Sequence, residues 1–127
     1  MAPIRILDGL PFVSATVYAN GSSLVIDNLL LDTASAACAF PTDALEDIGV
    51  KLEPGDMIQE MVGIGGSEYV VEKRITGIAV GDLVSGEIIV QLGKLGYIAS
   101  VNGILGLDFL LQTGAVIDLK TLDIRKG

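Results

Sequence analysis

Short apolar runs, each interrupted by turn-forming residues, are the feature that most restricts the fold of this 127-residue chain. The runs are rich in Val, Ile, Leu and Tyr, and Gly, Asn, Asp or Ser separates them. This pattern is typical of a β-rich domain with many short strands. Asn20-Gly21 favours the positive φ angles of a tight hairpin turn between two runs. We expect strands at residues 12–19, 24–31, 57–62, 69–80, 87–92, 116–119 and 122–125.

Only two segments have the features of a helix. Thr42 is a candidate N-cap for a short helix over residues 43–48, with acidic residues in its first turn and Gly49 just after its end. The second segment is 107–113, which Gly114 follows. The sequence therefore predicts a mostly β protein with one or two short helices.

The composition excludes several classes of function. Sixteen Asp and Glu against eight Lys and Arg give a net charge of −8, which repels a phosphate backbone, so nucleic acid is not an expected partner. The chain has no histidine, which excludes Ser-His-Asp and Cys-His catalysis and histidine-bearing zinc sites. Cys38, the single cysteine, has small and apolar neighbours and is expected to be a buried thiol. An enzyme of this composition would use carboxylates as its acid-base groups, and we expect no metal or cofactor.

The length of the chain suits one domain over residues 1–127, which can bury a core without disulfides or a structural metal. No apolar stretch approaches the roughly 18 residues that a membrane span needs. The first five residues lack the basic-then-apolar order of a signal peptide. We therefore expect no membrane span and a cytoplasmic rather than an exported protein.

Asp32 begins the sequence Asp-Thr-Ala-Ser at residues 32–35, directly after three leucines. A carboxylate at the point where a strand leaves the core is partly desolvated. Two carboxylates close together can share one proton and divide acid and base roles in hydrolysis. The chain has one such Asp-Thr and no internal repeat, so a second carboxylate would come from a second copy across a two-fold axis. The alternative is an ordinary turn or capping element.

Gly63-Ile64-Gly65-Gly66 lies between two extended segments and predicts a hairpin with a mobile, glycine-rich tip. A dinucleotide-binding loop is excluded because Glu68 occupies the place of the third glycine and no buried strand opening a helix surrounds the motif. An ordinary surface hairpin remains the alternative.

A third element, residues 103–111, places apolar residues around Gly106 and continues into the second predicted helix. This pattern suits a segment that is threaded through a core, although an apolar strand and helix occur in many compact folds. Asp108 is expected to cap that helix or to accept backbone hydrogen bonds.

Taken together and in this order, the three elements resemble the retropepsin-like family of aspartic proteases. Residues 32–35 match the active-site loop, residues 61–66 match the flap that covers the substrate, and residues 104–110 match the hydrophobic-glycine motif. The resemblance spans about residues 12–125. Residues 117–120, Ile-Asp-Leu-Lys, resemble the cellular members linked to ubiquitin shuttling more than the retroviral enzymes.

The resemblance implies a small closed β-barrel of the retropepsin type that forms a homodimer and acts as an aspartic endopeptidase on peptides or proteins. Asp32 from each subunit would form the catalytic pair, and Thr33 would reach across the dimer axis to support it. The substrate would contact Ala34 in the loop and Ile104 in a pocket wall, beneath the flap residues Gly63, Ile64, Gly65 and Gly66.

Two positions depart from the family pattern. Ala34 replaces the glycine of the triplet, and its methyl group is tolerated if its φ is negative but causes strain if the loop needs a positive φ. Leu107 replaces the arginine that is usual in retroviral enzymes, and the acid that would pair with it is missing too, with Ala36 and Ala37 in that region. Losing both partners leaves no buried charge unpaired. The alternatives are a catalytically inactive domain that binds peptides or dimerises, and an unrelated β-barrel interaction module.

Overall fold

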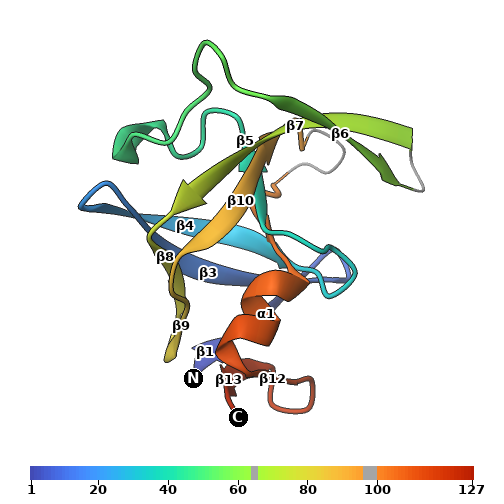
Figure 1. The fold of residues 1–127 in the computed structure, drawn as a ribbon. Coiled ribbons are helices and arrows are strands. Elements are labelled where there is room, and N and C mark those ends of the chain that lie inside the picture. The colour runs from blue at the N-terminus through green and yellow to red at the C-terminus, as the bar shows by residue number, and fades with distance from the viewer. Residues whose placement is uncertain (64–65, 96–99) are drawn as a thin grey trace.

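The computed structural model describes residues 1–63, 66–95 and 100–127, and most of these residues lie in strands (Figure 1). The main sheet contains ten strands in the order β6-β7-β10-β5-β11-β4-β3-β8-β9, with β2 paired to β3 outside this path. Its strands are β2 (Arg5–Leu7), β3 (Leu10–Ala19), β4 (Ser22–Leu31), β5 (Ala39–Pro41), β6 (Ile58–Gly63), β7 (Gly66–Ile75), β8 (Gly77–Val80), β9 (Leu83–Val84), β10 (Ile88–Gly93) and β11 (Gly103–Leu105).

A second sheet of three strands has the order β1-β13-β12. It consists of β1 (Ala2–Pro3), β12 (Ala115–Asp118) and β13 (Asp123–Lys126), and it holds both chain ends at the bottom of the view in Figure 1. The helix α1 (Leu107–Thr113) lies just above it. Across the described residues the strand pairing of each sheet is an open path. The mostly β fold is thus confirmed, while the closed barrel stays a prediction.

Two clusters of buried apolar side chains form the core. The larger cluster joins both sheets, because Ala2 and Ile124 of the small sheet pack with Val13 and Phe40 of the large one. The smaller cluster consists of Phe12, Leu30, Ala39, Val101 and Ile104, with Leu10 and Leu95 packed against it. Successive strand residues point to opposite faces of a sheet. Ile104 of β11 therefore lies in the smaller cluster, and its neighbour Leu105 lies in the larger one.

The predicted strands are present, with shifted ends and one division. The turn at Asn20-Gly21 has positive φ at both residues, 53° and 76°, as the hairpin between β3 and β4 requires. The single run expected at residues 69–80 is two strands, β7 and β8. The chain changes partners there, since β7 pairs with β10 and β8 with β3. The short strands β1, β2, β5 and β9 were not anticipated.

Of the two predicted helices, α1 is confirmed and ends at Gly114, whose φ is +65°. The helix expected over residues 43–48 was wrong: only the 3₁₀ turn η1 (Glu46–Ile48) forms, and its N-cap is Leu45 rather than Thr42. Leu45 and Ile48 are both buried, and residues three apart align on one side of a 3₁₀ turn. The amides of Ala44, Glu46 and Ile48 each bond the carbonyl three residues earlier, so turns form here in place of an α-helix. Across the described residues, no helix is long and apolar enough to cross a membrane.

Candidate active site

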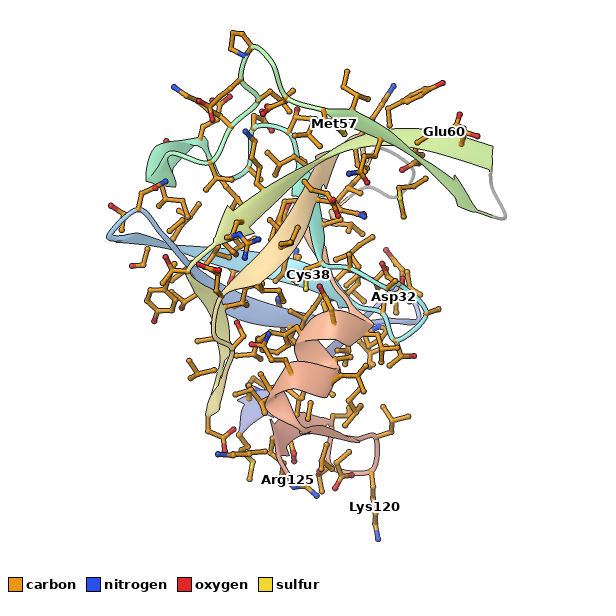
Figure 2. All side chains as sticks on the ribbon, viewed as in Figure 1. Asp32, Cys38, Met57, Glu60, Lys120 and Arg125 are labelled. Carbon is orange, nitrogen blue, oxygen red and sulfur yellow. The ribbon has the colours of Figure 1, made fainter. Side chains whose placement is uncertain are left out.

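Asp32 is the first residue after β4 and is half-buried in the single chain (Figure 2). Its amide donates to the carbonyl of Leu105, 3.1 Å away. Its carboxylate Oδ1 accepts from the Ala34 amide at 2.9 Å, and its carbonyl accepts from the Ser35 amide at 3.2 Å. A side chain that bonds the backbone two residues on is a typical turn of aspartate. The loop that begins at Asp32 is thus an aspartate turn, and its role as an active-site loop stays a prediction.

The methyl group of Ala34 does not strain this loop. Among the described non-glycine residues, positive φ angles occur at Asp8, Asn20, Asn28, Ser100 and Leu122, and Ala34 is not one of them. The Ala34 and Thr33 side chains are both exposed in the single chain. Alanine therefore fits the backbone of the loop as well as glycine would.

The segment that holds the Asp32 loop is β11 and the start of α1. The strand β11 is buried between β4, which is parallel to it, and β5, which is antiparallel. Gly106 then passes so close to the loop that a Cβ there would lie 2.6 Å from the carbonyl carbon of Ala37. The next amide, that of Leu107, donates to the Ser35 carbonyl at 2.7 Å. The expected threaded segment is present, and only glycine fits at position 106.

Cys38 is the last residue of the loop before β5, and it contacts Asp108, which lies 70 residues further along the chain. Asp108 Oδ2 accepts from the Cys38 amide at 3.3 Å, and Oδ1 accepts from the thiol at 3.3 Å and from the Phe109 amide at 2.8 Å. The Gly106 amide donates to Cys38 Sγ at 3.3 Å. Burial raises the pKa of the Cys38 thiol to about 12, so the thiol keeps its proton and can donate it. The expected buried thiol is confirmed.

The hairpin of β6 and β7 extends from the edge of the main sheet, at the upper right of Figure 1. Gly63 is paired with Gly66 at its end, while Ile64 and Gly65 lie outside the described residues. Asp32 lies on the same side of the view as the end of the hairpin (Figure 2). The predicted hairpin is confirmed, and its role as a cover for substrate stays a prediction.

Ile104 belongs to the smaller apolar cluster and is 6% exposed in the single chain. Residues paired across neighbouring strands point to the same face of a sheet. Phe12 is paired with Leu30, and Ile104 is paired with both Leu30 and Ala39. Leu30 lies two residues before Asp32. The apolar face that contains Ile104 therefore adjoins the carboxylate.

The same face continues into the hairpin. Gln91 is paired with Ala39 and with Glu72, which places all three on one face. Gln59 of β6 donates to Glu72 at 2.9 Å and lies on that face as well. Met61 follows two residues after Gln59, so the β-strand alternation directs it to the same face. One face of the sheet thus runs from the smaller apolar cluster to Gln59 and Met61 of the hairpin.

The fold brings the Asp32 loop and the segment from Ile104 to Asp108 into direct contact. The chain supplies Asp32 once, so a second copy of this carboxylate needs a second chain. In the described part of the chain, no group of three His, Cys, Asp or Glu side chains is arranged to hold a metal. The contact between Cys38 and Asp108 was not anticipated, because nothing in the local sequence links residues so far apart.

Comparison with known proteins agrees with this arrangement. A sequence model described as aspartyl protease matches residues 13–109. Among solved structures, a retropepsin-like aspartic protease from Rickettsia conorii is similar, with a TM-score of 0.69 and 21% identity over 98% of this chain and 87% of that chain. The search of curated proteins found no match. The chain therefore belongs to the aspartyl protease family and has the retropepsin-like fold.

Proposed function

We propose that this protein is an aspartic endopeptidase whose active site forms between two copies of the chain, with one Asp32 from each. The observation that carries the proposal is the Asp32 loop itself, whose entry is held by the hydrogen bond from the Asp32 amide to the Leu105 carbonyl. Thr33 and Ala34 are exposed beside it and are free to meet a second copy. Thr33 is the residue we expect to bond the partner loop across the axis.

The proposed reaction is hydrolysis by general acid-base catalysis without a covalent intermediate. Two carboxylates a few ångströms apart share one proton. The ionised Asp32 takes a proton from a bound water, which attacks the peptide carbonyl carbon, while the protonated partner donates a hydrogen bond to the carbonyl oxygen. The proton then passes to the leaving nitrogen as the C–N bond breaks. Activity should therefore depend on pH with a bell-shaped profile.

The substrate we expect is an extended peptide with apolar side chains near the cleaved bond. The sheet face that carries Ile104, Leu30 and Phe12 adjoins Asp32 and offers an apolar surface. An extended peptide can add to the hairpin as a strand, with backbone hydrogen bonds giving affinity and alternate side chains giving specificity. Gly63, Ile64, Gly65 and Gly66 are proposed to cover it, and Met61 to contact it from the hairpin face.

A second candidate function is an inactive domain that grips peptides or dimerises, and the observation that favours it is Ala34. Its methyl group is exposed next to Asp32, where it could meet the substrate even though the loop is unstrained. The same experiment separates the two functions.

The test is an incubation of the chain with a diverse peptide pool from acidic to neutral pH, at concentrations where sedimentation shows a dimer. Mass spectrometry of the products compares the unchanged chain with Asp32→Asn, Ala34→Gly and a control, Asp43→Asn, which changes another exposed carboxylate. We expect cleavage by the unchanged chain and by the Asp43 and Ala34 variants, and none by Asp32→Asn. Cleavage only after Ala34→Gly would support the inactive domain instead.

A further inference from the structure

In the segment formed by β11 and α1, Asp108 is the one residue whose side chain hydrogen-bonds to Cys38, the last residue of the Asp32 loop (residues 32–38). Every other described hydrogen bond from this segment to residues 32–38 uses its backbone: the Leu105 carbonyl with the Asp32 amide, the Leu107 amide with the Ser35 carbonyl, and the Gly106 amide with Cys38 Sγ. Asp108 adds two bonds, from the amide and the thiol of Cys38. This segment thus hydrogen-bonds the loop at Asp32, at Ser35 and at Cys38.

Cys38 is also the residue at which the Asp32 loop joins the main sheet. Its carbonyl accepts from the Gln91 amide of β10 at 2.9 Å, and β5 begins at the next residue. The Gln91 bond anchors the β5 side of Cys38, so loss of the bonds to Asp108 should shift the loop side of Cys38 and leave the strand that pairs with Ile104 in place. A misplacement of about 1 Å in an active site can reduce the rate by about 100-fold.

Both carboxylate oxygens of Asp108 are occupied by donors from two elements. Oδ1 accepts from the Phe109 amide in α1 and from the thiol, while Oδ2 accepts from the Cys38 amide. The buried thiol keeps its proton in the range where peptidases of this class would act, so this donor is always present. The Asp108 side chain therefore links the first turn of α1 to Cys38, the last residue of the loop.

We propose that Asp108 is a positioning residue of the active site, which fixes the loop that carries Asp32 by holding Cys38 through two hydrogen bonds. This inference rests on the proposed peptidase function. Asp108 itself contacts neither substrate nor water in the reaction. Its loss should lower kcat and leave KM nearly unchanged, because the apolar face and the hairpin that bind the peptide remain in place.

The test compares Asp108→Ala, Asp108→Asn and a control, Thr113→Val, in the full chain. Thr113→Val removes a bond of the same helix, from Thr113 Oγ1 to the Phe109 carbonyl at 2.8 Å, which involves neither Asp108 nor the loop. Asp108→Asn keeps the shape and one acceptor oxygen, but its amide group removes either the acceptor of the Cys38 amide or the shared acceptor of the Cys38 thiol and the Phe109 amide. It serves as the variant that folds if Asp108→Ala does not.

Two readouts are needed, namely kcat and KM on a cleaved peptide and the hydrogen exchange rates of the Cys38 and Phe109 amides by NMR. We expect Asp108→Asn to lower kcat at least about tenfold with KM within about twofold, and to speed exchange at the Cys38 or the Phe109 amide at least about tenfold. Thr113→Val should change neither. Equal kcat, or equal exchange at both Cys38 and Phe109, in the Asn and Val variants would overturn the inference.

The two proposals fail in different ways. Absence of Asp32-dependent cleavage by the unchanged chain contradicts the peptidase function. Unchanged exchange at both Cys38 and Phe109 in Asp108→Asn contradicts the positioning role whether or not peptides are cleaved.

Discussion

Ala34 carries a methyl group where the family's active-site motif has glycine, and the structure shows no backbone strain from it. Its φ lies outside the left-handed region and its side chain is exposed in the single chain. Alanine restricts the unfolded chain more than glycine does. Ala34→Gly should therefore lower the free energy of unfolding by about 0.4–1 kcal/mol, as measured by urea denaturation. A more stable glycine variant would show that the methyl group does strain the loop.

The ionisation of Cys38 predicts how the free energy of unfolding changes at high pH. Burial raises the pKa of its thiol from 9.0 to about 12 in the folded state. A folded-state pKa above the unfolded one means that the unfolded chain loses its proton first. The free energy of unfolding should be unaffected by this group below about pH 9 and fall as pH rises toward 12, by at most about 1.4 kcal/mol per pH unit.

Urea denaturation at pH 8, 9 and 10 measures this loss, and Cys38→Ser is the matched control. The serine hydroxyl does not ionise in this range, so the variant should lose less stability between pH 9 and pH 10. Equal losses in both proteins would contradict the assignment.

Individual residues were predictable where the local sequence decides their state. The small, apolar neighbours of Cys38 indicated its burial, and Gly114 marked the end of α1. The bond between Cys38 and Asp108 was not predictable, because it depends on how β11 is threaded past the loop. Asp108 was expected only to cap the helix or accept backbone bonds, which it does through Phe109 and Cys38.

Among the elements, the junction of β11 and α1 has a strict steric requirement at Gly106. A Cβ at Gly106 would lie 2.6 Å from a backbone atom of Ala37, which cannot move without shifting the Asp32 loop. Gly106→Ala should therefore lower the free energy of unfolding by about 1–3 kcal/mol and reduce cleavage. Gly86→Ala is the matched control, since the nearest atom to its Cβ would be Gln112 Oε1 at 3.9 Å. Urea denaturation of both variants checks this, and equal stability would contradict the close packing.

The prediction of elements was correct where one periodic run of residues forms one strand. It was wrong where hydrogen bonding within the fold, rather than the local sequence, decides the structure. The alternating run at residues 12–19 became β3, and the turn at Asn20-Gly21 followed from its φ preferences. The helix expected after Thr42 failed because the backbone amides of this segment bond carbonyls three residues back, which leaves one 3₁₀ turn. The division of β7 from β8 depends on their partners, which no local pattern reveals.

For the molecule as a whole, the order of the three motifs predicted the retropepsin-like fold, while a single chain contains only half of the proposed catalytic pair. Activity per mole of chain should therefore rise with concentration and level off as the dimer forms. Each copy carries a net charge of −8, so added salt should screen their repulsion and move the midpoint to lower concentration. Cleavage rates and sedimentation velocity over one dilution series check both effects. Constant activity per mole across monomer and dimer would contradict the shared site.

The most direct test mixes the unchanged chain with an equal amount of the Asp32→Asn variant and measures the peptide cleavage rate after subunit exchange. Random pairing places about half of the unchanged chains in mixed dimers, so the rate should fall to about half of that of the unchanged chain alone. The variant alone should be inactive. An undiminished rate in the mixture, or cleavage by the variant alone, would contradict an active site built from two Asp32 carboxylates.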